Sequence, residues 1–554
     1  MLIFKQSFFM LYLLISLLIL LPVFSGFGAA VNRYIHTTVT GVAANVLTGM
    51  LGLTVTFTLL AFFIPLSVWV EVFTVIIGFS LFLYLKVYRD IILFFKVQNF
   101  WFYLFSVLIL FAGSGFPFIL DHFGYYVPTS KWLAEVGLVR GIANLDLVLG
   151  QMSFWHILQA GFSRFTDPFM RLNSIMAMAY LMYVFEKKAW SHLILFPVLL
   201  LFVQSPSPDL PAVVLSLVVL NEILSKNKSH GWLFTVSVFA FAIKPTLIWL
   251  PVFSLLYIVS DSRRNFKTFF GGAAIGLLFI VKNCWTFGFP VFPVQAFDFG
   301  FSWKPHPDIL QISSETAYRK TFDMQFSVAE IKGFTLTQLM AEWLSLPFPK
   351  GLINILFILG LLIFLLFCVL QKQKVYWLLF LSIIIKTVLV LAFSAQYRFF
   401  LEVFFVLAVV FFYKKANNSQ VFIFSTALSL IILLMISFPK TLQKTLPNFR
   451  SGTFMTGLSV KQLIKPATFK LERFQTHQIG NLKFNIVEAY FYSFDTPLPA
   501  ITPYAIKKYD EAGIFPQLKG KTLSEGFVWK KLSKTDQRKL KQIIQKMNLE
   551  KYGR

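Results

Sequence analysis

Runs of apolar residues long enough to cross a bilayer recur along most of this chain, and they constrain its fold more than any other feature. A transmembrane helix needs about 20 consecutive apolar residues. Such runs lie near 7–26, 44–65, 67–86, 100–119, 171–186, 190–205, 210–224, 267–283, 351–371, 376–394, 397–413 and 419–438. A further stretch, 231–260, carries Lys244 and Pro245 at its middle, which favours two short helices joined by a turn over one long kinked helix. The sequence therefore predicts an all-α polytopic membrane bundle of about 14 transmembrane helices.

The composition excludes an ordinary soluble protein. The 554 residues are 57% hydrophobic and include 68 Phe, and the mean hydropathy is +0.71. The only two cysteines, Cys284 and Cys368, lie in or beside apolar runs, so neither a zinc site nor a disulfide framework is supported. No convincing small-residue cleavage site follows the first run, which we expect to be a retained helix.

Basic residues in the short loops predict the orientation of the bundle. One face collects Arg33, Lys86, Arg89, Lys96, Lys187, Lys188, Lys226, Lys228, Arg263, Arg264, Lys267, Lys372, Lys374, Lys414 and Lys415. Short cytoplasmic loops carry an excess of Lys and Arg, so we expect this face to be cytoplasmic. The opposite, outer face then holds the loops 120–170 and 284–350 and everything from 440 onward. The amino terminus also falls outside, with only Lys5 opposing this placement.

The chain divides by composition into a transmembrane domain, 1–439, and a basic tail, 440–554. The tail lacks long apolar runs and carries about half of the formal net charge of +25. We expect a small extracytoplasmic α+β domain, because long domains translocate largely regardless of charge. Its basicity is explained by attraction to anionic membrane lipids. It contains no nucleic-acid recognition module, so no nucleic-acid partner is expected.

The loop 120–170 opens with a charged pair and continues with an amphipathic pattern. Apolar residues around Trp132 and Trp155 recur at near-helical spacing, which predicts two helices lying along the outer membrane surface. Aromatic anchoring at the interface explains both tryptophans without any chemistry. It leaves unexplained the polar residues Asp121, His122, Asn144 and Asp146.

These features resemble the GT-C membrane glycosyltransferases, in which a helix ends in an acidic residue on the outer face before a long loop with surface helices. Similar elements follow in "IKPTLIWLPVF" at 243–253, "VKNCWTFGFPVFPV" at 281–294 and "QYRFFLEVFF" at 396–405. The segments "KWLAEVGLVRGIANL", "DTPLP", "TPY" and "LKGKTLSEGF" resemble an uncharacterised bacterial family of polytopic proteins associated with surface polysaccharides. This resemblance covers nearly the whole chain and implies a GT-C-like bundle in the bacterial inner membrane.

The resemblance implies transfer of a sugar from a polyprenyl-phosphate donor to a glycan, lipid or protein acceptor on the outer face. Asp121 matches the general base that takes the proton of the acceptor hydroxyl. His122 would assist this proton transfer, stabilise phosphate or cap the loop. GT-C enzymes commonly have two acids here, whereas His122 follows Asp121, so a two-carboxylate metal site is not evident. No metal ligands are predicted, and a divalent metal is optional in this scheme.

Three cations at outer helix ends are candidates for binding the leaving phosphate: Lys244, Lys282 and Arg398. Snorkelling to the headgroups explains Lys282 at least as well, and pairing with Glu402 four residues on explains Arg398. Lys244 is the sharpest candidate, because a cation between apolar segments needs an anion or a wet cavity.

The remaining polar positions carry weaker predictions. Asn144 and Asp146 follow Gly141 and shape a turn or bind sugar, and Asp209 in "SPSPD" reads as a helix cap. The loop 295–350 is long enough to fold over the site as a lid. A transporter or flippase for a lipid-linked saccharide is one alternative function, which intramembrane charge pairs would favour. A polysaccharide polymerase or ligase is another, which paired Arg and His in the outer loops would favour.

Overall fold

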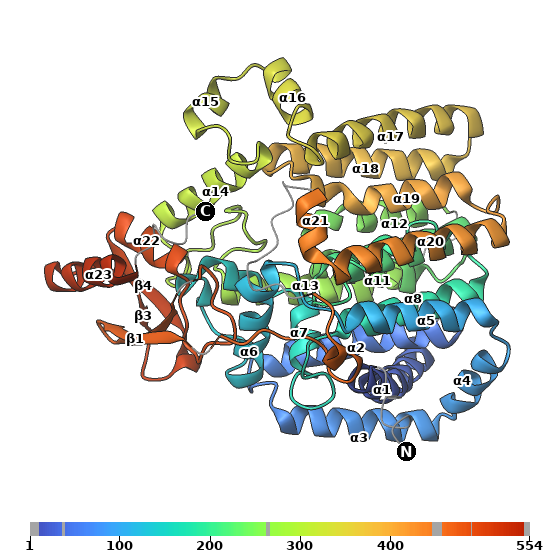
Figure 1. Ribbon diagram of the computed structural model, residues 1–554, viewed down its shortest axis with the longest axis horizontal. Coiled ribbons are helices and arrows are strands. Elements are labelled where there is room, and N and C mark those ends of the chain that lie inside the picture. The colour runs from blue at the N-terminus through green and yellow to red at the C-terminus, as the bar shows by residue number, and fades with distance from the viewer. Residues whose placement is uncertain are drawn as a thin grey trace.

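The computed structural model describes residues 10–35, 39–261, 266–445, 457–471, 473–488 and 490–547. Lys5, Arg263 and Arg264, which enter the orientation argument, lie outside these residues. The described chain is mostly helical, with a small sheet region near its carboxyl end (Figure 1).

Six segments are long and apolar enough to cross a membrane. They are Leu11–Arg33 within α1 (Leu11–Ile35), α2 (Val42–Ala61), Phe266–Thr286 with α13 (Phe270–Thr286), α17 (Lys350–Gln371), α18 (Lys374–Phe393) and α20 (Asn418–Ser437). A seventh arises if α3 (Val68–Tyr84) and α4 (Val87–Lys96), bent by 76° at their junction, count as one broken span. Residues such as Leu362 and Ile431 on α17 and α20 are 57% and 53% exposed, which suits contact with lipid. These helices are compatible with a multi-pass membrane protein.

The prediction of about 14 transmembrane helices is not confirmed, because several apolar runs are interior helices. In α8 (Leu172–Lys187) every residue from Leu172 to Phe185 is buried, and α10 (Asp209–Leu224) is buried from Leu210 to Ile223. A helix that is apolar all round is buried in protein or lipid, and composition alone does not distinguish the two. Each of these helices has 16 residues, so it is about 24 Å long, shorter than a hydrocarbon core of about 30 Å.

Other apolar runs are broken or short. The stretch 190–205 contains only η4 (Trp190–Leu193) and α9 (Phe196–Leu199), separated by turns. The hairpin expected at 231–260 is present: α11 (His230–Ile243) ends at Lys244, η5 (Pro245–Leu247) makes the turn, and α12 (Trp249–Val259) packs back on α11. The helices α5 (Phe100–Gly113) and α19 (Leu401–Phe412) are also short.

The loop 120–170 folds into the protein. It forms the π-helical turn η1 (His122–Tyr126), α6 (Val127–Glu135), η2 (Ile142–Asn144), η3 (Leu147–Gln151) and α7 (Phe154–Ala160). The interpretation of Trp132 and Trp155 as interface anchors is wrong, because they are 1% and 0% exposed. Trp132 meets Phe527 edge to face at 5.8 Å between ring centroids, and Trp155 Nε1 donates to Asn173 at 2.6 Å. The tail therefore covers a surface that the sequence assigned to lipid.

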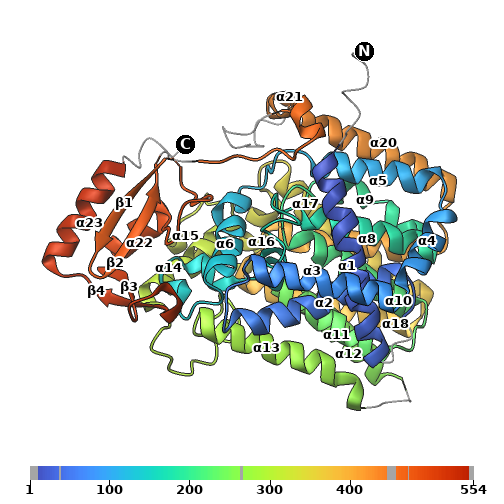
Figure 2. The same ribbon diagram turned by 90° about the horizontal axis from the view of Figure 1, so that it is seen from below.

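The tail forms a small α+β unit at one end of the molecule. It begins after α21 (Pro439–Thr445) and η8 (Val460–Leu463). The strands β1 (Phe474–Ile479) and β2 (Leu482–Val487) pair antiparallel, as do β3 (Ile514–Leu518) and β4 (Phe527–Lys531). The helices α22 (Pro503–Glu511) and α23 (Lys534–Met547) accompany them, with η9 (Leu523–Glu525) before β4. Both views place this unit beside α14 (Pro307–Thr321) and away from α4 (Figures 1 and 2).

The loop 284–350 is largely helical. After α14 come α15 (Val328–Gly333) and α16 (Leu336–Leu344), each begun by a capping box. Figure 1 shows α15 and α16 projecting from the body, while α14 lies between them and the tail. Of these three helices only α14 borders the site described below, together with Phe292 from the start of the same loop.

Candidate functional site

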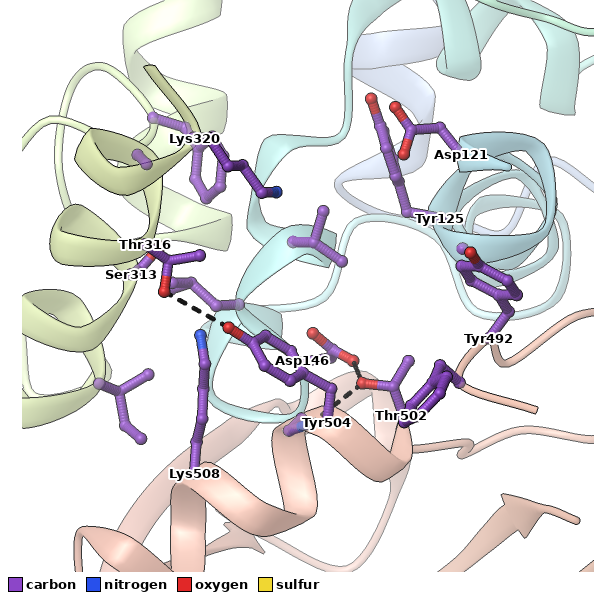
Figure 3. Close-up of a pocket in the computed structure, with 18 of the residues that line it drawn as sticks. Asp121, Tyr125, Asp146, Ser313, Thr316, Lys320, Tyr492, Thr502, Tyr504 and Lys508 are labelled. Carbon is purple, nitrogen blue, oxygen red and sulfur yellow. Dashed lines mark hydrogen bonds between the residues drawn. The ribbon is translucent and has the colours of Figure 1, made fainter. Parts of the chain in front are cut away.

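A cavity of about 440 Å³ lies where the loops 120–170 and 284–350 meet the tail. Its walls come from η1 and the turn before η3, from α14, and from α22 with the segment before it (Figure 3). Its polar lining residues are Asp121, Tyr125, Asp146, Ser313, Thr316, Lys320, Gln396, Tyr492, Thr502, Tyr504, Lys508 and Tyr509. Its size falls within the range of small-molecule sites, about 300–1,000 Å³.

Asp121 faces this cavity and is held by a cation that lies 277 residues further along the chain. Arg398 Nη1 donates to Asp121 Oδ2 at 3.0 Å, and the two side chains are 44% and 34% exposed. Within the described residues Oδ1 accepts no hydrogen bond. Burial raises the pKa of the neighbouring Tyr125, and the Asp121 carboxylate raises it further. The site therefore presents one carboxylate oxygen beside an uncharged phenol.

Arg398 does not make the alternative pair expected from its spacing. Glu402 pairs instead with Lys386 of α18, and both side chains are almost completely buried, at 3% and 0% exposed. Arg398 lies in η7 (Tyr397–Phe400), one turn earlier, where it reaches out to Asp121. The i, i+4 spacing of Arg398 and Glu402 therefore does not predict the partner of Arg398.

Lys244 does not line the cavity, and it forms an ion pair with Asp209. Its Nζ donates to Asp209 Oδ1 at 2.5 Å, and Ser207 Oγ donates to Asp209 Oδ2 at 2.7 Å. Asp209 also acts on Arg398: burial lowers the pKa of Arg398, but Asp121, Tyr125 and Asp209 raise it above its ordinary value. Asp121 with Arg398 and Asp209 with Lys244 thus form two ion pairs, which interact electrostatically through Arg398 and Asp209.

Lys282 and His122 bond to the protein and do not line the cavity. Lys282 Nζ donates to the carbonyl oxygens of Gln151 and Met152 at 2.6 and 3.1 Å. His122 Nδ1 lies 2.9 Å from Ser205 Oγ. Burial, reinforced by nearby cationic and imidazole groups, holds the pKa of His122 well below its ordinary value, so its ring is neutral.

Asn144 and Asp146 join the loop to the tail. Asn144 Nδ2 donates to the carbonyl oxygens of Trp303 at 2.7 Å and of Phe527, in the tail, at 3.4 Å, and Asp146 Oδ2 accepts from Thr502 Oγ1 at 2.6 Å. Burial raises the pKa of Asp146, and the Thr502 hydrogen bond opposes part of that rise. Gly141 has φ +60, and a Cβ there would lie 2.5 Å from the Phe527 carbonyl oxygen, so glycine permits this close approach.

The sequence analysis missed Lys320, Lys508 and the tyrosine walls. Lys320 lies within the loop 295–350, which was expected to form a lid, and no single residue of that loop was singled out. Lys508 is one of many lysines in a basic tail and carries no local signal. Asp209 was noticed, but only as a helix cap. Among the described residues, no group of three or more His, Cys, Asp or Glu is placed to hold a metal ion.

The fold and the site define a multi-pass helical protein with a composite polar cavity at one end of its bundle, closed by a small α+β unit. The chain belongs to the family described as a domain of unknown function, DUF8201, which matches residues 10–405. Neither the curated proteins nor the solved structures contain a match to it. The matched range includes Asp121, Lys320 and Arg398 and ends before the tail.

Proposed function

We propose that this protein is a membrane glycosyltransferase that moves a sugar from a polyprenyl-phosphate donor to an acceptor within the cavity. The observation that carries the proposal is the Asp121 carboxylate, which faces a cavity of substrate size with Oδ2 held by Arg398. A positioned carboxylate within reach of an acceptor hydroxyl acts as general base. The ion pair fixes the orientation of the carboxylate while Oδ1 faces the substrate.

The walls of the cavity suit a sugar. Tyr125, Tyr492 and Tyr504 supply aromatic faces with hydroxyl groups, and Ser313 and Thr316 add further hydroxyls. A few polar groups on apolar walls are what orient a small molecule in a protein site. The resemblance to GT-C enzymes supports the donor class, and the six candidate spans agree with a lipid-linked substrate.

In the proposed reaction Asp121 removes the proton of the acceptor hydroxyl as its oxygen bonds to the anomeric carbon of the donor. The bond from that carbon to the phosphate oxygen breaks, and the polyprenyl phosphate leaves with the bonding electrons. Cations near the leaving phosphate stabilise the charge that develops on it.

The test is Asp121→Asn, which keeps the size of the side chain and an amide oxygen that can accept from Arg398. We expect normal accumulation and a loss of sugar transfer of about 10²–10⁴-fold, the usual contribution of general-base catalysis. Asp298→Asn is the matched control, because Asp298 is an exposed outer-loop carboxylate that pairs with Lys304 and does not line the cavity. Full activity of the Asp121→Asn protein in transfer from a polyprenyl-phosphate sugar would refute the proposal.

A second function, transport of a lipid-linked saccharide, is favoured by one observation. Lys386 on α18 and Glu402 on α19 form an ion pair inside the helical body. Ionisable residues within membrane helices often mark ion or substrate pathways. If the protein is a transporter, Lys386→Met will abolish movement of the lipid across reconstituted vesicles while Asp121→Asn leaves it intact. Absence of such movement with the parent protein would refute the transporter.

A further inference from the structure

The cavity contains two lysines that come from different walls. Lys320 extends from α14 and Lys508 from α22, and both ammonium groups point into the space between these helices (Figure 3). One helix belongs to the outer loop and the other to the tail, so this arrangement exists only when the tail is docked.

Neither lysine forms an ion pair within the part of the chain that the structure describes. The Lys508 ammonium lies 4.3 Å from the centre of the Tyr504 ring, a cation–π contact that leaves its three donors available. Partial removal from water and the nearby Arg398 lower the pKa of Lys320, Asp121 and Tyr504 oppose part of this change, and Lys508 lowers the pKa further. The two ammonium groups therefore repel each other where the protein places them.

The two carboxylates that line the cavity offset part of this charge, but within the described residues neither forms an ion pair with Lys320 or Lys508. Asp121 is paired with Arg398. Asp146 is buried and hydrogen-bonded to Thr502, and burial raises its pKa. The lining is therefore locally positive between α14 and α22, which favours binding of an anion.

We propose that Lys320 and Lys508 form a phosphate subsite, in which the outer loop and the tail together clamp a phosphate ester of the molecule that occupies the cavity. Two ammonium groups can donate charge-assisted hydrogen bonds to different oxygens of one phosphate. The hydroxyl groups of Thr316 on α14 and Tyr504 on α22 lie 3.4 Å apart and connect the two walls beside the lysines. The subsite deepens the proposed function and rests on it, since it assigns a phosphate-bearing substrate to the same cavity.

This assignment changes the phosphate ligands expected from the sequence. Lys244 is neutralised by Asp209, Lys282 by backbone carbonyls, and Arg398 by Asp121. Lys320 and Lys508 are the lining cations that have no such partner among the described residues. The phosphate belongs either to the lipid donor or to a phosphorylated acceptor, and the chemistry of recognition is the same for both.

The experiment measures binding of inorganic phosphate to the purified full-length protein in detergent, by calorimetric titration. Lys320→Met and Lys508→Met should each weaken binding about tenfold or more, since each removes a charge-assisted hydrogen bond. Lys507→Met is the matched control, because Lys507 is an exposed neighbour on α22 outside the cavity lining and should bind as the parent does. Lys508→Arg should keep most of the affinity, which separates loss of charge from loss of the fold.

Competition against phosphate then identifies the source. A short prenyl phosphate that competes indicates the donor, and a sugar phosphate that competes indicates the acceptor. Absence of phosphate binding in the parent protein, or unchanged binding in both Met variants, would overturn the proposal. A protein that binds phosphate through these lysines yet transfers no sugar would retain the subsite and refute the transferase, so the two failures are distinguishable.

Discussion

Arg171 is a buried cation with several hydrogen-bond acceptors, whereas Lys320 and Lys508 are cations that line a cavity. The Arg171 side chain is 0% exposed, and its guanidinium donates to the carbonyl oxygens of Gly113, Phe169 and Ala467 at 2.8, 2.5 and 2.7 Å. It thereby ties the end of α5 to the segment that leads into the tail. Lys320 and Lys508 have no ion-pair partner in the described chain and face open space.

The contrast separates structural charges from functional ones. A buried charge is tolerated when its hydrogen bonds are complete, and removing it leaves its partners unsatisfied. A charge that faces a cavity without a partner contributes little to the fold and is available to a ligand. Burial and hydrogen-bond partners therefore predict which substitutions unfold the protein and which affect only binding.

The largest effect is expected from Arg171→Met. It leaves at least three carbonyl oxygens without their donor and removes the cation near Asp167, a loss of about 3–5 kcal/mol for a broken buried network. We expect little monodisperse protein on size-exclusion chromatography in detergent. Lys320→Met is the control and should give normal yield. Equal yields of the two variants would contradict the distinction between a buried structural cation and a cation that faces the cavity.

A pH effect of intermediate size is expected from Asp167, which lies in the same buried network. Burial raises its pKa to about 7, above the ordinary value of about 4. The folded protein thus binds this proton more tightly than the unfolded chain, so the stabilisation is complete below about pH 4 and is lost as the pH rises through about 7. The thermal midpoint should fall across this window, and Asp167→Asn should flatten the fall. An identical pH profile in the Asn variant would contradict the assignment.

A smaller effect is expected from Tyr509→Phe at the contact between tail and loop. The Tyr509 hydroxyl donates to the carbonyl oxygens of Asn144 and Leu145, at distances of 2.8 and 3.1 Å. Its loss should cost about 1–2 kcal/mol and increase proteolysis of the tail before global unfolding. Lys507→Met, at an exposed position on the same helix, should leave the proteolysis rate unchanged.

The smallest effect is expected from Lys131→Met. Lys131 Nζ pairs with Asp495 Oδ1 at 3.1 Å, and the Asp495 side chain is 48% exposed. Exposed ion pairs typically contribute no more than about 1 kcal/mol. The thermal midpoint should shift by only a few degrees. A collapse comparable to that of Arg171→Met would mean that exposure does not separate the two classes of charge.

Local patterns in the sequence predicted the features of the fold that depend only on residues close together in the chain. Lys244 and Pro245 marked the hairpin correctly, because proline removes a helical hydrogen bond. Hydropathy did not show that α8 and α10 are interior helices, since a protein core and a lipid core select the same residues. The burial of Trp132 could not be predicted, because Phe527, whose ring packs against it, lies far away in the sequence.

The sequence singled out some residues of the cavity, such as Asp121 and Asp146, but neither their pairing nor Lys320 and Lys508. Asp121 and Arg398 were both singled out, yet their contact joins residues that no local spacing connects. Glu402, the nearer acid, is taken by Lys386. Lys508 became recognisable only once α22 was seen to form a wall of the cavity.

The position of α22 has a consequence for the order of events in the cell. Domains form as synthesis proceeds from the amino end, so Asp121 and Lys320 leave the ribosome long before Tyr504 and Lys508. Until the last helices dock, the nascent chain has an open, half-built cavity and cannot hold a substrate between two walls. A premature stop before Pro503 would yield a chain with all the candidate membrane spans and no complete site. Completion of translation thus serves as the final assembly step of this cavity.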